Sequence, residues 1–168
     1  MTDFQALYER YAPQVRRFAL FLAGDSTLAD DLTAETFVRA WTAPGTIRQE
    51  TVKAYLFTIA RNLYHDSLHH SRRLVLLDEH VQDKQPDPHK HAEDRSDLDF
   101  VLGEMQRLAE VDRAALLMSA QEGMSYDEIS QALNLSLSAV KVKIHRARLM
   151  LMQSMMERSQ QRSTRRNP

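Results

Sequence analysis

The stretch that decides the fold runs from Ser125 to Arg148 and reads SYDEISQALNLSLSAVKVKIHRAR. Its first four residues have the spacing of a capping box, in which the serine oxygen accepts from the amide three residues on and the glutamate reaches back. A short helix is therefore predicted from there to about Leu133. Asn134 tolerates the left-handed conformation that a sharp turn after a helix requires, and Ser136 is suited to cap a second helix.

The second of these helices has two faces of opposite character. Apolar residues at i, i+4, i+7 and i+11 are expected to pack inward, namely Val140, Ile144, Ala147 and Leu151. The other face is strongly basic and carries Lys141, Val142, His145, Arg146 and Arg148. In helix-turn-helix motifs the second helix enters the DNA major groove, and flanking cations hold phosphates. The alternative is a helix with ordinary solvated surface charge, which the hydrophobic spacing alone does not exclude.

Three further helices are predicted before residue 75, because apolar residues recur there at three- and four-residue steps. They span 3–22, then a cap at Asp25 or Ser26 to the turn at 43–45, then about 51–73. Pro13 is expected to kink or split the first. The expected inward face of the second consists of Leu28, Leu32, Phe37, Ala40 and Trp41.

Residues 76–97 lack helical periodicity and carry Pro86 and Pro88 among charged residues, a composition typical of an extended linker. The formal net charge of the whole chain is only -1, although this segment is strongly acidic. From 78 to 99 there are eight acids (Asp78, Glu79, Asp83, Asp87, Glu93, Asp94, Asp97, Asp99) against three bases (Lys84, Lys90, Arg95). Periodicity resumes at Leu98 with two short helices, and the polar residues after Arg158 predict a frayed tail.

The sequence thus predicts an all-α protein, in which two small helical domains are joined by a flexible acidic linker and the second is a helix-turn-helix domain. The predicted boundaries are 1–75, 76–97 for the linker, 98–158, and 159–168 for the tail. Without cysteine, a signal peptide or an apolar run of about 20 residues, the chain is expected to be cytoplasmic and to have no membrane partner.

Catalysis has no candidate residues in the sequence, and the candidates for metal binding are incomplete. There is no Gly-rich phosphate loop and no nucleophile beside a base, so we do not expect an enzyme. His65 with His69, and His89 with His91, invite a metal hypothesis, but no carboxylate or cysteine at a suitable spacing completes either site. We therefore expect no metal and no cofactor.

Three segments closely resemble the extracytoplasmic-function (ECF) group of the sigma-70 family. In chain order they are 30–41, 54–63 with Asp66, and 125–129 with 140–148. This is the family's order, and the acidic linker precedes the third segment. The resemblance implies a factor that binds bacterial core RNA polymerase and lends it promoter recognition. It also implies that the acidic linker runs toward the RNA exit path, where negative charge mimics nucleic acid. The alternative is a solvated tether, and the two are compatible.

The resemblance assigns a role to each segment. The helix at 30–41 would meet the coiled coil of the polymerase clamp through Asp31, Leu32, Glu35 and Arg39. Ala34 stands where the family often has Gln, so one polar contact is expected to be lost or replaced. The residues implied to open and read the minus 10 element are Arg48, Arg61, Asn62, His65, Asp66, His69 and Arg73. Those implied to read the minus 35 element are Ser136, Ser138, Lys141, Val142, His145, Arg146 and Arg148.

The expected partners are core polymerase, promoter DNA and an anti-sigma protein that covers the surfaces facing them. Lys141 and Arg146 would bond guanine edges or phosphates, and Val142 would contact a thymine methyl. Two alternatives stay open at this point. One is a helix-turn-helix regulator that acts without polymerase docking, and the other is a protein-interaction adaptor that uses the first domain only.

Overall fold

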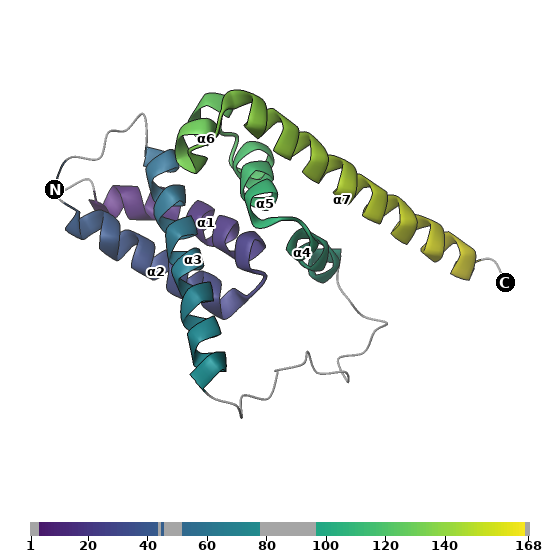
Figure 1. Cartoon of the computed structure of the whole chain (residues 1–168), viewed down its shortest axis with the longest axis horizontal. Coiled ribbons are helices and arrows are strands. Elements are labelled where there is room, and N and C mark those ends of the chain that lie inside the picture. The colour runs from purple at the N-terminus through teal and green to yellow at the C-terminus, as the bar shows by residue number, and fades with distance from the viewer. Residues whose placement is uncertain (1–3, 44, 46–51, 78–96, 167–168) are drawn as a thin grey trace.

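The computed structural model describes residues 4–43, 45, 52–77 and 97–166, and within these ranges every regular element is a helix. The elements are α1 (Phe4–Ala23), α2 (Ser26–Thr42), α3 (Val52–Leu77), α4 (Asp97–Arg107), α5 (Glu110–Leu116), the short π-helix η2 (Leu117–Gln121), α6 (Tyr126–Leu133) and α7 (Leu137–Arg166). Helices α1 to α3 form one bundle and α4 to α7 a second (Figure 1). The predicted all-α, two-domain fold is confirmed.

The first bundle is held by apolar faces on its three helices. Fully or almost fully buried are Val15, Phe18 and Leu22 of α1, Leu32, Phe37 and Ala40 of α2, and Leu56, Phe57, Ala60 and Leu63 of α3. The rings of Phe18 and Phe57 lie 4.8 Å apart at the centre. Each large side chain buried in this way contributes about 1.5–3 kcal/mol, so packing rather than helix propensity holds the bundle.

Two predictions for this bundle need correction. Helix α1 is continuous through Pro13, so the predicted split is wrong, whereas the predicted kink stays a prediction. A proline inside a helix costs about 3 kcal/mol, and packed residues on both sides of it keep α1 against the core. Trp41 is 57% exposed instead of inward. It lies in the last turn of α2, and its ring packs in an edge-type arrangement on the Phe4 ring, with the ring centres 4.5 Å apart.

The second bundle contains the predicted helix-turn-helix. Ser125 Oγ accepts from the Glu128 amide at 3.2 Å, and the Glu128 carboxylate accepts from the Ser125 amide at 2.7 Å. Asn134 has φ 52°, in the left-handed region, and Ser136 Oγ accepts from the Ala139 amide at 3.1 Å. Val140, Ile144 and Ala147 are buried as predicted. Helix α7 continues to Arg166, so the frayed tail predicted after Arg158 is wrong, whereas residues 78–96 of the predicted linker lie outside the described residues.

The two bundles pack against each other, α1 against α4 and η2, and α3 against α6 (Figure 1). The Gln106 side chain of α4 donates to the Phe21 carbonyl at the end of α1, at 3.0 Å. Gly24 follows α1 with φ 71°, and a Cβ there would lie 2.9 Å from the Gln106 side chain. The positive φ therefore favours glycine at this position, and a Cβ would in addition require the Gln106 side chain to shift.

Candidate nucleic-acid interface

The outer face of the helix-turn-helix is open to solvent. All the residues that the sequence predicts there are exposed: Ser136, Ser138, Lys141, Val142, His145, Arg146 and Arg148. Val142 is 59% exposed although it is apolar and stands among cations. An apolar side chain on a basic recognition face is suited to contact a thymine methyl. The face is thus free to meet a duplex, and no described residue of the first bundle covers it.

Arg146 is held from behind by a buried carboxylate. Its Nε and Nη2 donate to the two oxygens of Asp112 at 2.7 and 3.0 Å, while Lys143 Nζ lies 3.4 Å from the same carboxylate. Asp112 is 3% exposed in the first turn of α5. The hydrogen bonds from Arg146 lower the pKa of Asp112 against the opposing effect of burial. Two donors of Arg146 are therefore committed within the protein, and the rest of its guanidinium is oriented outward.

On α3, one predicted contact residue is covered by the other bundle. Arg61 donates from Nε and Nη2 to the two oxygens of Glu110, at 2.8 and 2.9 Å. Both side chains are largely buried, and His65 Nε2 lies 3.1 Å from the same carboxylate. Burial by itself would raise the pKa of Glu110, but Arg61, together with His65, lowers it below its ordinary value. The contact therefore favours an ionised Glu110 at neutral pH.

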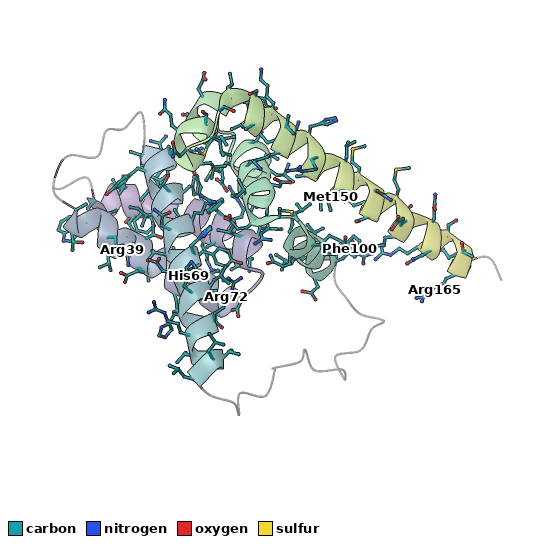
Figure 2. The ribbon with its side chains drawn as sticks, in the orientation of Figure 1. Arg39, His69, Arg72, Phe100, Met150 and Arg165 are labelled. Atoms are coloured by element: carbon teal, nitrogen blue, oxygen red, sulfur yellow. The ribbon has the colours of Figure 1, made fainter. Side chains whose placement is uncertain are left out.

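The remaining predicted residues of α3 are open. Asn62, Asp66, His69 and Arg73 are exposed. Figure 2 shows His69 and Arg72 on the part of α3 that extends away from the second bundle. Arg48 lies outside the described residues. Of the aromatic residues, Phe57 and Tyr64 are buried, so they pack in the core and form no open pocket for bases.

A second ion pair joins the bundles at Glu122. Its carboxylate, 1% exposed, accepts from Arg17 Nε and Nη2 at 3.0 to 3.1 Å, while Lys53 Nζ donates to its backbone carbonyl at 2.9 Å. Burial raises the pKa of Glu122, and Arg17 offsets only part of this effect. Sequence reasoning missed Glu110, Asp112 and Glu122. Their one local signal is that the first two stand in the opening turn of a helix, where acids are common for reasons of the helix dipole.

The surface predicted to meet polymerase lies on α2. Asp31, Glu35 and Arg39 are exposed, and Arg39 Nε lies 3.3 Å from Glu35 and its Nη1 4.0 Å from Asp66 of α3 (Figure 2 labels Arg39). Leu32 is 5% exposed and packs in the core, so it supports this face from within. Among the described residues no group of three or more His, Asp or Glu side chains is placed to hold a metal ion, and no helix is long and apolar enough to cross a membrane.

Comparison with known proteins decides the family. Residues 7–74 match the family Sigma-70 region 2, and residues 101–151 match Sigma-70, region 4. The ECF RNA polymerase sigma factor SigL of Mycobacterium tuberculosis is 31% identical over 147 residues, which are 85% of this chain and 83% of SigL. The chain belongs to the ECF group of the sigma-70 family. The first bundle of this sigma factor is thus region 2 and the second is region 4.

Other relatives agree with this assignment. The ECF RNA polymerase sigma factor SigM of Bacillus subtilis is 30% identical over 147 residues, 84% of this chain and 88% of SigM. Among solved structures, the sigma factor RpoE of Bartonella quintana, in complex with the anti-sigma factor NepR, has the same fold, with a TM-score of 0.75, 24% identity, and coverage of 93% of this sigma factor and 98% of RpoE. CnrH, in complex with the cytosolic domain of CnrY, gives a TM-score of 0.67 at 25% identity, covering 92% and 88% of the two chains.

Proposed function

We propose that this sigma factor binds core RNA polymerase through the α2 face formed by Asp31, Glu35 and Arg39, and that it directs promoter-specific initiation. Region 2 would open and read the minus 10 element with α3, and region 4 would read the minus 35 element with α7. The observation that supports this proposal most strongly is the exposed basic face of α7 on a capped helix-turn-helix. Membership in the family supplies the polymerase partner.

The exposed face of α7 suits the reading of a duplex in the major groove. Lys141, Val142 and His145 lie in its first turns, which is the part of a recognition helix that reaches base edges. Arg146 is already bonded to Asp112, so a phosphate contact, which needs one outward donor, fits it better than bidentate bonding to a guanine. Lys141 and Val142 are therefore the residues we expect to select sequence.

For α3 to engage the minus 10 element with Arg61, the two regions have to separate. In the packed arrangement the Arg61 side chain is 16% exposed and is bonded to Glu110 of region 4. The exposed residues Asn62, Asp66 and His69 can meet DNA without this movement. We infer that binding to polymerase, which has to place the two regions on separate promoter elements, releases Arg61.

A protein partner that keeps the factor inactive is also part of the proposal. RpoE was solved with the anti-sigma factor NepR, and CnrH with the cytosolic domain of CnrY. By analogy we propose an anti-sigma protein for this chain, which would cover the surfaces that face polymerase and DNA.

A DNA-binding assay with and without polymerase tests the proposal against a regulator that acts alone. Labelled duplexes with randomised bases at the minus 10 and minus 35 elements are mixed with the sigma factor, with core polymerase, and with both. We expect sequence-selective binding only when both proteins are present. Tight selective binding by the sigma factor alone, unchanged by polymerase, would instead favour the regulator. Arg165→Ala, at the far end of α7, serves as the control for Lys141→Ala, because both remove an exposed cation from one helix.

A further inference from the structure

Helix α7 continues well beyond the helix-turn-helix. From Leu149 to Arg166 it extends roughly 27 Å, away from the rest of the protein (Figure 1). One side of this extension faces α4, where Ser154 helps to line a shallow pocket and the Arg158 guanidinium lies 4.1 Å from the centre of the Phe100 ring. Figure 2 shows Phe100 and Met150 where α4 and α7 approach each other. The opposite side of α7 meets no described element.

That opposite side carries an apolar row, which we call the outer seam. It consists of the apolar residues Val142, Leu149, Met152 and Met156, with His145 between the first two. These residues follow one another at steps of three and four, the spacing of the a and d positions through which two helices pack in a coiled coil. Val142, Leu149, Met152 and Met156 are each more than half exposed. An apolar row this exposed, even with His145 within it, indicates a surface that a partner covers, and methionine adapts well to varied partner surfaces.

The charges beside the outer seam indicate the chemistry of its partner. Lys141, Arg146 and Arg148 occupy positions that correspond to e and g of a heptad beside the first half of the row, and two donors of Arg146 are bonded to Asp112. The e and g positions beside Met152 and Met156 are uncharged: Gln153, Met155 and Gln160. Glu157 is the one acidic residue among the 30 of α7. Residues at e and g select the partner helix by charge, so a helix with acidic residues on both sides of its apolar row is favoured.

Two other occupants fit less well. A second copy of α7 would bring the same arginines face to face along the seam, which disfavours self-association. The chain's own acidic segment 78–96 has the right charge, but its apolar residues are only Val81 and Ala92 apart from prolines, too few to fill a heptad row. The seam therefore requires a helix with an apolar row that this chain does not provide.

We propose that the outer seam binds an acidic amphipathic helix of a partner protein. Val142 and His145 belong both to the seam and to the face proposed to read the minus 35 element. A helix on the seam would thus exclude the minus 35 duplex, a consequence that rests on the proposed function. The binding itself does not depend on that function, because it needs neither polymerase nor DNA.

A designed peptide of about three heptads tests the seam directly. It has leucine at a and d, glutamate at e and g, and a fluorescent label, and its binding to the full chain is followed by anisotropy. We expect saturable binding that weakens as salt is raised, and no comparable binding of a matched peptide with lysine at e and g. Substituting both methionines, Met152→Gln and Met156→Gln, should weaken binding at least about tenfold. Glutamine keeps helix propensity and adds no charge that would repel the peptide by itself.

Leu77→Gln is the control, because it removes an exposed apolar side chain on α3. It should leave binding unchanged, and circular dichroism should show that all variants fold. No binding of the acidic peptide, equal binding of the lysine peptide, or binding that persists without Met152 and Met156 would overturn the proposal. So would a dimer in sedimentation equilibrium that the methionine substitutions abolish, since the occupant would then be a second copy. Failure of the bound peptide to displace a minus 35 duplex would count against the proposed DNA role and not against the seam.

Discussion

Arg61 of region 2 and Glu110 of region 4 form a two-hydrogen-bond ion pair, at 2.8 and 2.9 Å, across the boundary between the domains. The two side chains are 16% and 18% exposed. The same pair covers a cation that the proposed function needs at the minus 10 element. The strength of this ion pair thus affects how readily regions 2 and 4 separate.

Replacing Glu110 by glutamine should open the packed form. The substitution removes the charge that Arg61 meets, while the similar size of glutamine leaves the packing of α5 in place. Since the chain has no cysteine, dyes can be attached at Glu9→Cys in region 2 and Gln160→Cys in region 4. We expect lower energy transfer between the dyes in Glu110→Gln than in the parent. Asp30→Asn, which breaks an exposed ion pair within region 2, should leave the transfer unchanged.

Acid should weaken the Glu110 contact. The pKa of Glu110 is lower in the packed form than its ordinary value, so its contribution is fully present above the ordinary pKa and is lost as pH falls through the lowered one. Glu122 acts in the opposite sense, because burial raises its pKa and acid therefore relieves the cost of its charge. In the same energy-transfer assay, the fall in transfer below about pH 4.3 should be steeper in the parent than in Glu110→Gln. Identical profiles for the two proteins would contradict the assigned role of Glu110.

The stability of region 4 should depend on Asp112 more strongly than the hydrogen-bond distances of Asp112 alone suggest. The exposed pair of Arg16 and Asp30 is as short, at 2.6 Å, as the 2.7 Å bond from Arg146 to the buried Asp112. We expect Asp112→Asn to lower the free energy of unfolding by about 1–3 kcal/mol, because a buried hydrogen-bonded carboxylate is lost. Asp30→Asn should cost about 0–1 kcal/mol, because solvent screens that pair. Urea denaturation measures both, and equal costs would show that burial does not decide the difference.

The turn of the helix-turn-helix offers a test of backbone conformation. Asn134 has φ 52°, which alanine adopts at a cost of about 1 kcal/mol and glycine adopts freely. Asn134→Ala should therefore destabilise region 4 by about that amount, whereas Asn134→Gly should be close to neutral. Thermal unfolding of the two variants distinguishes them, and the reverse order would exclude a left-handed Asn134.

Two residues of α7, Val142 and Arg148, should affect DNA binding in different ways. With polymerase present, Val142→Ala should relax the base preference at one position of the minus 35 element, because an apolar contact to a thymine methyl is lost. Arg148→Ala should weaken binding to all sequences alike and reduce the slope of affinity against salt by about one, as expected for a phosphate contact. Selection of bound duplexes followed by sequencing measures the first effect, and a salt titration measures the second. Uniform loss for both variants would remove Val142 from the list of sequence readers.

The sequence predicts those features that depend on residues close to one another in the chain. The capping box at Ser125 and the turn at Asn134 involve residues within four positions of one another, so both can be recognised from the amino-acid sequence. The ion pairs that join the domains cannot be recognised from the sequence, because Arg61 and Glu110 are 49 residues apart and Arg17 and Glu122 are 105 residues apart. The full length of α7 is not predicted for another reason. Its polar end is rich in Met, Gln and Arg, whose helix propensity sustains a helix without a core face.

Run-off transcription with purified core polymerase on a promoter library tests the central claim most directly, since it requires docking, recognition and opening together. We predict transcripts from a specific subset of promoters only when the sigma factor is added, and a strong loss of these transcripts for the combined variant Lys141→Ala and Asn62→Ala. No specific transcript from a folded protein that binds core polymerase, or transcripts unaffected by the combined variant, would contradict the account.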